Sequence, residues 1–301
     1  MYGRFAPSPT SDLHVGNLRT AVASWLMART TGRGHLVRIE DLDAARVAAA
    51  PQVAARQLAD LAAVGIDWDG QLLVQSQRTD AYAAALQRLD LYECFCTRRE
   101  IAEAASAPHA DDGHRPYPGT CLTLTDAERT ARRAFRAPAL RVRAAGARVT
   151  IADRWAGPVT ASVDDFVVRR NDGAYAYNLA VVVDDLASDV TQVVRGDDLL
   201  SSSPRQAWLA RALGGAEPEY AHVGLVVNDQ GRRLAKRDGA VTLADRAARG
   251  ESVAATRTLL AASLGLCRRD QHIDLATLRS RFDPSRLPRT PWCWNEPGAT
   301  G

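Results

Sequence analysis

Residues 2–17 read YGRFAPSPTSDLHVGN and predict how the fold begins. Residues 2–6 are typical of a short strand, and the prolines that follow end it in a loop. The apolar residues beyond this loop recur at helical spacing. His14, Gly16 and Asn17 therefore lie where the loop passes into a helix N-terminus. The unpaired backbone amides and the helix dipole at such a position favour a bound phosphate.

The alternation of strand and helix continues beyond this start. Residues 34–39 are typical of a strand, and residues 53–64 predict a helix that the following glycine ends. This β-α-β-α order predicts an α/β fold with a parallel sheet. The apolar runs at 181–183 and 190–195 predict further buried strands. The Asn-Asp-Gly sequence at 171–173 predicts a hairpin turn.

The positive charges of the chain are divided unequally between arginine and lysine. Of 38 basic side chains a single one is lysine, Lys236, in the stretch 232–237 (RRLAKR). An ammonium is a compact charge on a flexible stem that suits one oxygen of a moving phosphate, whereas a guanidinium is a planar fork. One lysine could also remain by chance on a solvated face. Together with the phosphate-binding helix start, Lys236 instead indicates the second half of a nucleotide site.

Two short stretches carry a family resemblance. Residues 14–17 (HVGN) and 234–237 (LAKR) occupy the places of the two signatures of class I aminoacyl-tRNA synthetases, which this chain resembles. Asn17 stands where a histidine is usual, and Arg233 and Arg237 flank the lysine where other residues are usual. The resemblance implies a Rossmann-type nucleotide-binding sheet and the activation of an amino acid with ATP.

The glutamyl branch of that family is indicated by a longer set of matches. They run in order along about four-fifths of the chain, which chance does not explain. The matching stretches are residues 4–10, 37–43, 75–78, 176–180 and 194–199.

The length of the chain separates two kinds of glutamyl enzyme. A conventional glutamyl-tRNA synthetase continues into large helical domains that hold the anticodon, whereas about sixty residues follow Lys236 here, enough for one small helical layer. The chain therefore resembles the short glutamyl-Q tRNA(Asp) synthetases, and residues 288–292 (PRTPW) are similar to the tail of that branch. This resemblance implies that L-glutamate is activated with ATP and attached to the queuosine base in the anticodon of tRNA(Asp).

Such a reaction sets chemical requirements. Because a glutamate carboxylate itself attacks the α-phosphate, catalysis needs positioning and charge stabilisation rather than a protein nucleophile. We assign that role to His14 and Lys236, with Mg²⁺ on the phosphates of ATP. Glutamate carries two carboxylates and one ammonium, so it needs two cationic anchors and one anionic anchor.

The motifs of the resemblance supply residues for each requirement. Arg4 and Arg195 fit the carboxylates through bidentate pairing, and Glu40 fits the ammonium. The expected glutamate-binding set is Arg4, Phe5, Ala6, Pro7, Ser8, Glu40, Tyr177 and Arg195. The expected ATP-binding set is His14, Gly16, Asn17 and Lys236, with Gly16 under the adenine.

Three of the five cysteines are grouped in the chain: Cys94, Cys96 and Cys121. In a reducing compartment such thiols are more often metal ligands than disulfide partners. The polar loop between them cannot bury itself well, so one structural Zn²⁺ would explain how it holds a shape. The family resemblance nominates Tyr117 as the fourth ligand. Unaided chemistry prefers an imidazole, from His114 or His109.

These inferences divide the chain into four expected parts. Residues 1–80 are the first half of a Rossmann catalytic domain. Residues 81–175 are an inserted subdomain, similar to an acceptor-binding one, with the zinc loop at 94–121. Residues 176–226 complete the Rossmann domain, and residues 227–301 carry the Lys236 loop and a small C-terminal helical region without an anticodon-binding domain.

Composition limits the partners less than the motifs do. The 301 residues are 46% hydrophobic, which is enough for a sizeable core. A net charge of +3 is too small to indicate an RNA-binding protein by itself, so a tRNA-facing surface must come from local arginine clusters. The candidates are Arg132, Arg133, Arg136, Arg141, Arg143, Arg205 and Arg211.

The remaining expectations concern location and rival functions. The sequence has no basic N-terminal region followed by an apolar run and no stretch of membrane-spanning length, so we expect a cytoplasmic protein without membrane contact, acting as a monomer. The alternatives are a small-molecule amino-acid ligase on the same scaffold, a truncated conventional glutamyl-tRNA synthetase, and a non-catalytic RNA-binding paralogue. A phosphate-activating lysine would serve no purpose in the last of these.

Overall fold

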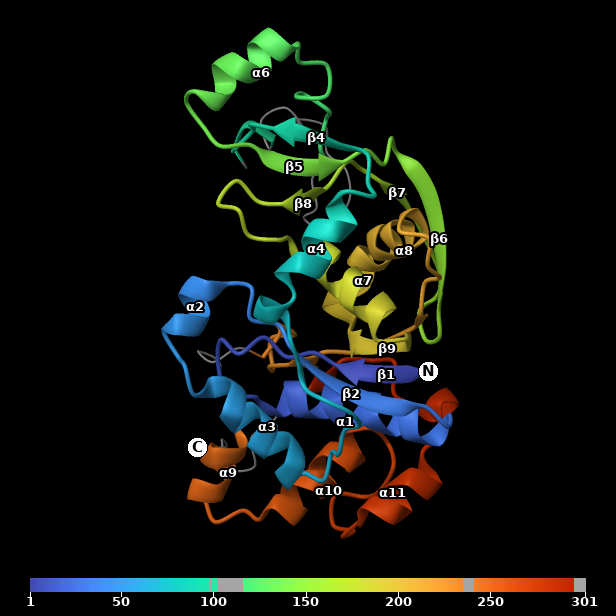
Figure 1. Ribbon diagram of the computed structural model, residues 1–301. Coiled ribbons are helices and arrows are strands. Elements are labelled where there is room, and N and C mark those ends of the chain that lie inside the picture. The colour runs from blue at the N-terminus through green and yellow to red at the C-terminus, as the bar shows by residue number, and fades with distance from the viewer. Residues whose placement is uncertain (98, 102–115, 235–240, 295–301) are drawn as a thin grey trace.

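The centre of the protein is a mostly parallel sheet of seven strands (Figure 1). The computed structural model describes residues 1–97, 99–101, 116–234 and 241–294. The strands follow the order β3-β2-β1-β9-β10-β6-β7, and every neighbouring pair is parallel except β6 and β7. In this order they span Leu73–Val74, Gly34–Ile39, Tyr2–Phe5, Val190–Gly196, Glu219–Val223, Ala147–Asp153 and Gly157–Val163. The α/β fold class predicted from the alternation of elements is confirmed.

Helices cover both faces of this sheet and bury a core on each side. On one face α1 (Val15–Thr30) packs across β1 and β9, and its buried side chains join those of α3 (Val53–Ala63), α10 (Val253–Ser263) and α11 (Leu275–Arg281). On the other face lie α4, α7 and α8, whose buried side chains pack with those of β6 and β7 (Figure 1). These three helices span Thr79–Leu86, Tyr177–Ala187 and Ser203–Ala212.

The predicted β-α-β-α start is confirmed as β1, α1, β2 and α3. A short helix, α2 (Ala44–Ala48), lies between β2 and α3, and the 3₁₀ turn η1 (Gln75–Gln77) follows β3. Helix α3 is followed by Gly65, whose φ of +93° is a left-handed conformation that glycine adopts readily. The sequence therefore predicted both the order of the first elements and the residue that ends α3.

The prediction of a strand at 181–183 was wrong, because these valines lie inside α7. All residues from Leu179 to Asp185 of this helix are buried. An apolar segment that is buried on every side shows no 3.6-residue periodicity and cannot be told from a buried strand. The β-branched side chains lower helix propensity only slightly, so tertiary packing decides the conformation. The prediction for 190–195 is confirmed by β9.

A smaller antiparallel sheet lies beyond α4 in Figure 1, with the order β4-β5-β8. Its strands span Leu91–Cys94, Ala139–Val142 and Val167–Arg169, and α6 (Asp126–Arg133) lies at its far side (Figure 1). The predicted turn at 171–173 is confirmed, since Gly173 N donates to Arg170 O at 3.0 Å and its φ is +87°. After this turn the chain pairs back with β8 through a single bridge between Arg169 and Tyr175, so the hairpin has one strand and no full second strand.

The segment between β5 and β8 joins the two sheets. Strands β6 and β7 form an antiparallel hairpin, and β6 also pairs with β10 of the large sheet. Residues from the expected insertion at 81–175 thus belong to both sheets. We keep the four expected parts of the chain as a proposal.

The C-terminal quarter forms a small helical layer below α1 in Figure 1. It comprises α9 (Leu243–Ala248), α10, α11 and a 3₁₀ turn, η4 (Pro284–Arg286). The last strand, β12 (Trp292–Cys293), pairs in parallel with β11 (Val226–Val227). Each helix within the described ranges is too short or too polar to cross a lipid bilayer.

Candidate active site

A cavity lies at the edge of the sheet where the parallel strands β1, β2 and β9 end, which is where α/β sheets commonly bind ligands. Every predicted glutamate-binding or ATP-binding residue that the structure describes lines it. These residues are Arg4, Phe5, Ala6, Pro7, Ser8, His14, Gly16, Asn17, Glu40, Tyr177 and Arg195. Three predicted site residues lie outside the described residues: Lys236, His109 and His114.

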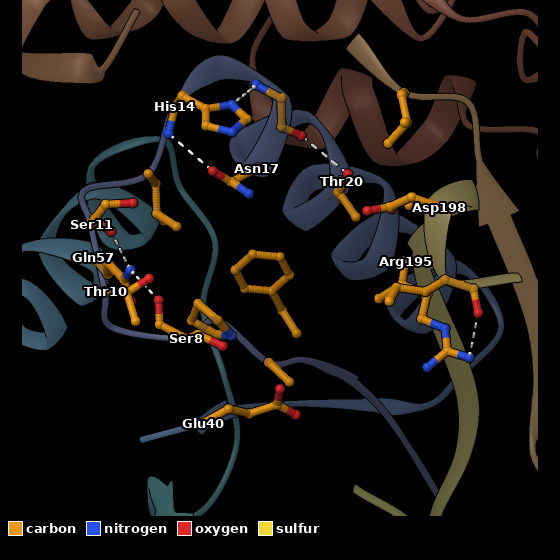
Figure 2. A pocket seen from close by; sticks show the side chains of 18 of the residues that line it. Ser8, Thr10, Ser11, His14, Asn17, Thr20, Glu40, Gln57, Arg195 and Asp198 are labelled. Carbon is orange, nitrogen blue, oxygen red and sulfur yellow. Dashed lines mark hydrogen bonds between the residues drawn. The ribbon is translucent and has the colours of Figure 1, made fainter. Parts of the chain in front are cut away.

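Figure 2 shows how side chains from distant parts of the sequence surround this cavity. His14 and Asn17 lie at one end, at the N-terminus of α1, and Glu40 lies at the opposite end with Ser8. Arg195 lies on a third side. The motifs that were quoted separately from the sequence therefore converge on one space.

His14 lies at the N-terminus of α1, as the sequence predicted, and it also caps this helix. Its Nδ1 accepts a hydrogen bond from Gly16 N at 3.0 Å, and its backbone N donates to Asn17 Oδ1 at 3.2 Å (Figure 2). Because Nδ1 is an acceptor here, the proton of the neutral ring is on Nε2. Burial, and then the charge of Arg233, lower the pKa of His14 to about 4. His14 is therefore a neutral hydrogen-bond donor at neutral pH, and not a cation.

Position 16 must be a glycine because of the neighbouring His14 side chain, as well as because of any bound ligand. A Cβ atom at this position would lie 2.8 Å from His14 Cε1 and 2.9 Å from His14 Nδ1. Any side chain would displace the imidazole and break its hydrogen bond with the backbone. From the sequence, only a close contact with a ligand was expected to require this glycine.

The loop after β1 is fixed by a glutamine that no sequence motif indicated. Gln57 of α3 is 1% exposed, and its amide donates to Ser8 O at 3.1 Å and to Ser11 O at 2.7 Å (Figure 2). These bonds satisfy backbone carbonyls of a segment that has no strand partner. Gln57 therefore holds the wall that carries Ser8.

Arg4 and Glu40 are joined by a buried ion network. Asp185 accepts from Arg4 Nε and Nη2 at 3.3 Å each and from Arg38 Nη1 at 2.5 Å. Arg38 Nη2 also donates to Glu40 Oε1 at 3.1 Å. Arg4 therefore has a carboxylate partner of its own, and Glu40 is oriented by a cation behind it.

A second aspartate of α7 extends the network. Asp184 is fully buried and accepts from Tyr82 Oη at 2.7 Å, from Gln75 Nε2 at 3.0 Å and from Arg78 Nε at 3.1 Å. The network contains as many carboxylates as arginines, and buried charges are tolerated when they are paired in this way. Burial raises the pKa of Glu40, although Arg38 and Arg4 oppose this shift. A ligand ammonium beside Glu40 would favour its ionised form.

Arg195 is held differently. It is 4% exposed, and its five N–H groups donate to neutral acceptors. The acceptors are His222 Nε2, Gln206 Oε1, Ser203 Oγ, Tyr177 Oη and Leu199 O. Among the described arginines that line the cavity, Arg4 pairs with Asp185 and Arg233 pairs with Asp198. Arg195 thus offers the cavity a positive charge that no carboxylate of the described residues compensates directly.

The stretch that leads to Lys236 starts at the wall of the cavity. Arg233 lines the cavity, and Leu234 N donates to Val226 O at 2.9 Å. Leu234 is buried in the core on the α1 face of the sheet. The chain therefore reaches residues 235–240 from a fixed position at the cavity.

A second cavity adjoins the first. The two share Ser8, Glu40 and Tyr177, and the second extends toward the smaller sheet. Its walls offer charged groups, amides and aromatic rings. The further polar and aromatic residues that line it are Asp43, Gln75, Arg141, Arg170, Asn171 and Tyr175.

The three grouped cysteines converge next to this second cavity. Their sulfur atoms lie within 4.8 Å of one another, and Cys96 Sγ is 3.5 Å from Cys121 Sγ. Tyr117 Oη lies 3.5 Å from Cys94 Sγ and 3.8 Å from Cys96 Sγ. Sulfurs bound tetrahedrally at about 2.3 Å from one ion are separated by about 3.8 Å. This cluster could bind a metal ion.

Several arginines that were candidates for a tRNA-facing surface have other partners. Arg141 is buried, with its Cζ 3.6 Å from the centre of the Tyr117 ring, so it packs against the cysteine cluster and also lines the second cavity. Others form ion pairs: Arg133 with Glu93, Arg143 with Asp90, Arg205 with Asp164 and Arg211 with Glu217. Arg132 is exposed near Phe135, which is 92% exposed.

The fold and this cavity can be compared with known proteins. The family model described as tRNA synthetases class I (E and Q), catalytic domain, matches residues 1–272. The chain belongs to this family. It is therefore a ligase of the aminoacyl-tRNA synthetase type, and the family resemblance stated from the sequence is confirmed.

Relatives of the synthetase chain carry a more specific name. It is 56% identical to the glutamyl-Q tRNA(Asp) synthetase of Nocardia farcinica, covering 98% of this chain and 94% of that protein. It is 54% identical to the protein of the same name from Cutibacterium acnes, covering 88% of this chain and 76% of that protein. The resemblance to this short branch, stated from the sequence, is thus confirmed.

Solved synthetases share the fold. A glutamate tRNA ligase from Elizabethkingia meningosepticum is 23% identical and superposes with a TM-score of 0.81 over 98% of this chain and 67% of that one. The glutamate-tRNA synthetase of Elizabethkingia anophelis is 24% identical, with a TM-score of 0.82 over 98% of this chain and 68% of that one.

Proposed function

We propose that this synthetase activates L-glutamate with ATP and transfers the glutamyl group to queuosine in the anticodon of tRNA(Asp). The observation that carries the proposal is the convergence of Arg4, Glu40 and Arg195 on one cavity with His14. The names of relatives at 44% to 56% identity support the choice of acceptor. We place the reaction in the cytoplasm, where ATP and tRNA are available.

The charges of the cavity suit glutamate. Glutamate brings two carboxylates and one ammonium, a net charge of −1. The ion network around Arg4 and Glu40 is balanced, whereas in the described part of the chain Arg195 contacts only neutral acceptors. One carboxylate would therefore take Arg195 as its partner, and the ammonium would lie beside Glu40.

The activation step would occur at the N-terminus of α1. An oxygen of the glutamate carboxylate attacks the α-phosphorus of ATP, and the bond to pyrophosphate breaks. His14 Nε2–H and the backbone amides of this helix end would donate to phosphate oxygens. Lys236 would add positive charge as the bond to pyrophosphate breaks. Mg²⁺ on the phosphates would neutralise further charge.

The transfer step needs room for an acceptor. A hydroxyl of queuosine attacks the activated carbonyl carbon, and AMP leaves. The second cavity adjoins the glutamate site at Ser8, Glu40 and Tyr177. Its amide and aromatic side chains, such as Asn171 and Tyr175, suit a modified base with hydroxyl groups. We propose that the acceptor base enters there.

Two assays test the function. ATP–pyrophosphate exchange with each amino acid should be strongest with glutamate. Transfer of radioactive glutamate should occur to tRNA(Asp) that contains queuosine and not to the same tRNA without it. Equal labelling of the unmodified tRNA would indicate a conventional 3′-end acceptor. Pyrophosphate exchange that does not depend on glutamate would contradict the proposal.

We also propose that the cysteine cluster holds one structural zinc ion, with Tyr117 as its fourth ligand. Elemental analysis of protein purified without chelators should give about one zinc per chain. Cys94→Ser or Cys121→Ser should lose the metal, whereas Cys267→Ser, outside the cluster, should keep it. Tyr117→Phe and His114→Ala, each measured separately, would identify the fourth ligand. A metal-free wild-type protein would contradict the site.

A further inference from the structure

The hydrogen bonds of Arg195 fall into two sets. His222 Nε2 accepts from Nε at 2.9 Å, Gln206 Oε1 from Nη1 at 2.8 Å, and Ser203 Oγ from Nη2 at 2.8 Å. These three acceptors do not line the cavity. Tyr177 Oη and Leu199 O belong to residues that do, and each lies at 3.3 Å. The three shorter bonds therefore hold the guanidinium on the side away from the cavity. A ligand carboxylate would bind on the side of the two longer bonds.

His222 accepts the hydrogen bond from Arg195 Nε and so fixes that edge of the guanidinium. It lies on β10 directly beside Arg195 in the parallel register with β9. Its Nδ1 lies 2.6 Å from Asp153 Oδ2. Because a guanidinium can only donate, His222 Nε2 must accept, and the ring proton must be on Nδ1 facing Asp153. A ring that accepts at Nε2 and carries its proton on Nδ1 is neutral. Burial favours this form because it lowers the pKa of His222, although the hydrogen bond with Asp153 opposes this shift.

Asp153 is itself fixed at the end of β6. Its Oδ2 also accepts from His222 N at 3.1 Å, and its Oδ1 accepts from Trp155 N at 2.9 Å and Ala156 N at 2.8 Å. Both oxygens are thus occupied by donors. The hairpin that carries Asp153 lies outside the cavity, yet it reaches Arg195 through one imidazole ring.

This arrangement orients a cation without neutralising it. Asp185 contacts Arg4 directly and compensates its charge. At Arg195 the carboxylate of Asp153 is separated from the guanidinium by the neutral ring of His222. Asp153 therefore fixes the orientation of Arg195 through His222, and the positive charge of Arg195 remains available to a ligand carboxylate.

We propose that His222 and Asp153 are positioning residues that hold Arg195 for recognition of the substrate carboxylate. The inference rests on the proposed activation of glutamate. Neither residue touches the substrate, and both act through Arg195.

Two matched variants of one position separate this role from a structural one. His222→Asn keeps an amide near the position of Nδ1, within reach of Asp153, but loses the acceptor for Arg195. His222→Gln can place its amide oxygen near the position of Nε2 and keep that acceptor. In pyrophosphate exchange, His222→Asn should raise KM for glutamate about ten- to a hundredfold, with KM for ATP unchanged. His222→Gln should restore most of the affinity.

A third variant, Asp153→Asn, tests the tautomer. Its side-chain amide would offer one acceptor oxygen where the wild-type carboxylate has two, so it cannot serve both the turn amides and the imidazole. If the amide NH₂ faces His222, the ring proton moves to Nε2 and opposes Arg195 Nε–H. This variant should also raise KM for glutamate about tenfold or more, with KM for ATP unchanged.

The outcomes distinguish the inference from the proposed function. Unchanged KM for glutamate in His222→Asn, in an active background, would overturn the inference and leave the function intact. The inference would also be overturned if His222→Asn and His222→Gln raised KM equally, for glutamate and ATP alike, and both lowered Tm. A purely structural role of His222 predicts that result. A wild type without glutamate-dependent exchange would overturn both.

Discussion

Lys236→Ala should lower the rate of glutamate activation by about two to three decades, with little change in KM for glutamate. The reason is that an ammonium that meets the phosphates mainly as pyrophosphate departs stabilises the transition state more than the bound substrate. The chain approaches this lysine from Arg233, which lines the cavity, and from the buried Leu234. Steady-state ATP–pyrophosphate exchange at varied glutamate concentrations would measure both the rate and KM.

Lys236→Arg is the more informative change, because arginine supplies every other basic side chain of this protein. We expect this variant to fold, to bind ATP and to lose most of its activity, since the planar fork cannot follow a single phosphate oxygen as an ammonium does. Arg232→Ala, an exposed cation nearby that does not line the cavity, should retain activity. Full activity in Lys236→Arg would mean that the single lysine has no special role.

Arg195→Gln should raise KM for glutamate by about one to two decades and remove most of the preference for glutamate over glutamine. The wild-type site presents an uncompensated guanidinium, so a neutral amide loses a charge-assisted hydrogen bond of about 1.5–3 kcal/mol. In the variant both side chains meet a neutral amide. Exchange assays with the two amino acids would give both KM values.

The matched control for this prediction is Arg211→Gln on α8. Arg211 pairs with Glu217 at the surface and lies outside the cavity, so KM should not change. If wild-type protein exchanged glutamine as well as glutamate, the assignment of Arg195 to a substrate carboxylate would be refuted.

Local features of this protein could be predicted from the sequence alone. The strand, loop and helix at residues 2–17 depend on proline, capping residues and apolar spacing, all of which act within a few residues. The same holds for the left-handed Gly65 after α3. The ordered motifs also pointed to many of the residues that line the cavity, because each motif ends a strand or starts a helix at the same edge of the sheet, whereas Gln57 lies in no motif.

Only the tertiary structure decided the partners of those residues. Arg38 and Asp185 are 147 positions apart, and Asp153 and His222 are 69 apart, so no local pattern connects them. The sequence placed residues 181–183 in a strand because a segment buried on all sides loses its helical periodicity. Spacing determines local conformation, whereas the pairing of buried charges depends on which distant segments the packed core brings within a few ångströms. That is why the sequence named Arg195 but could not reveal that neutral groups hold it and leave its charge for a ligand.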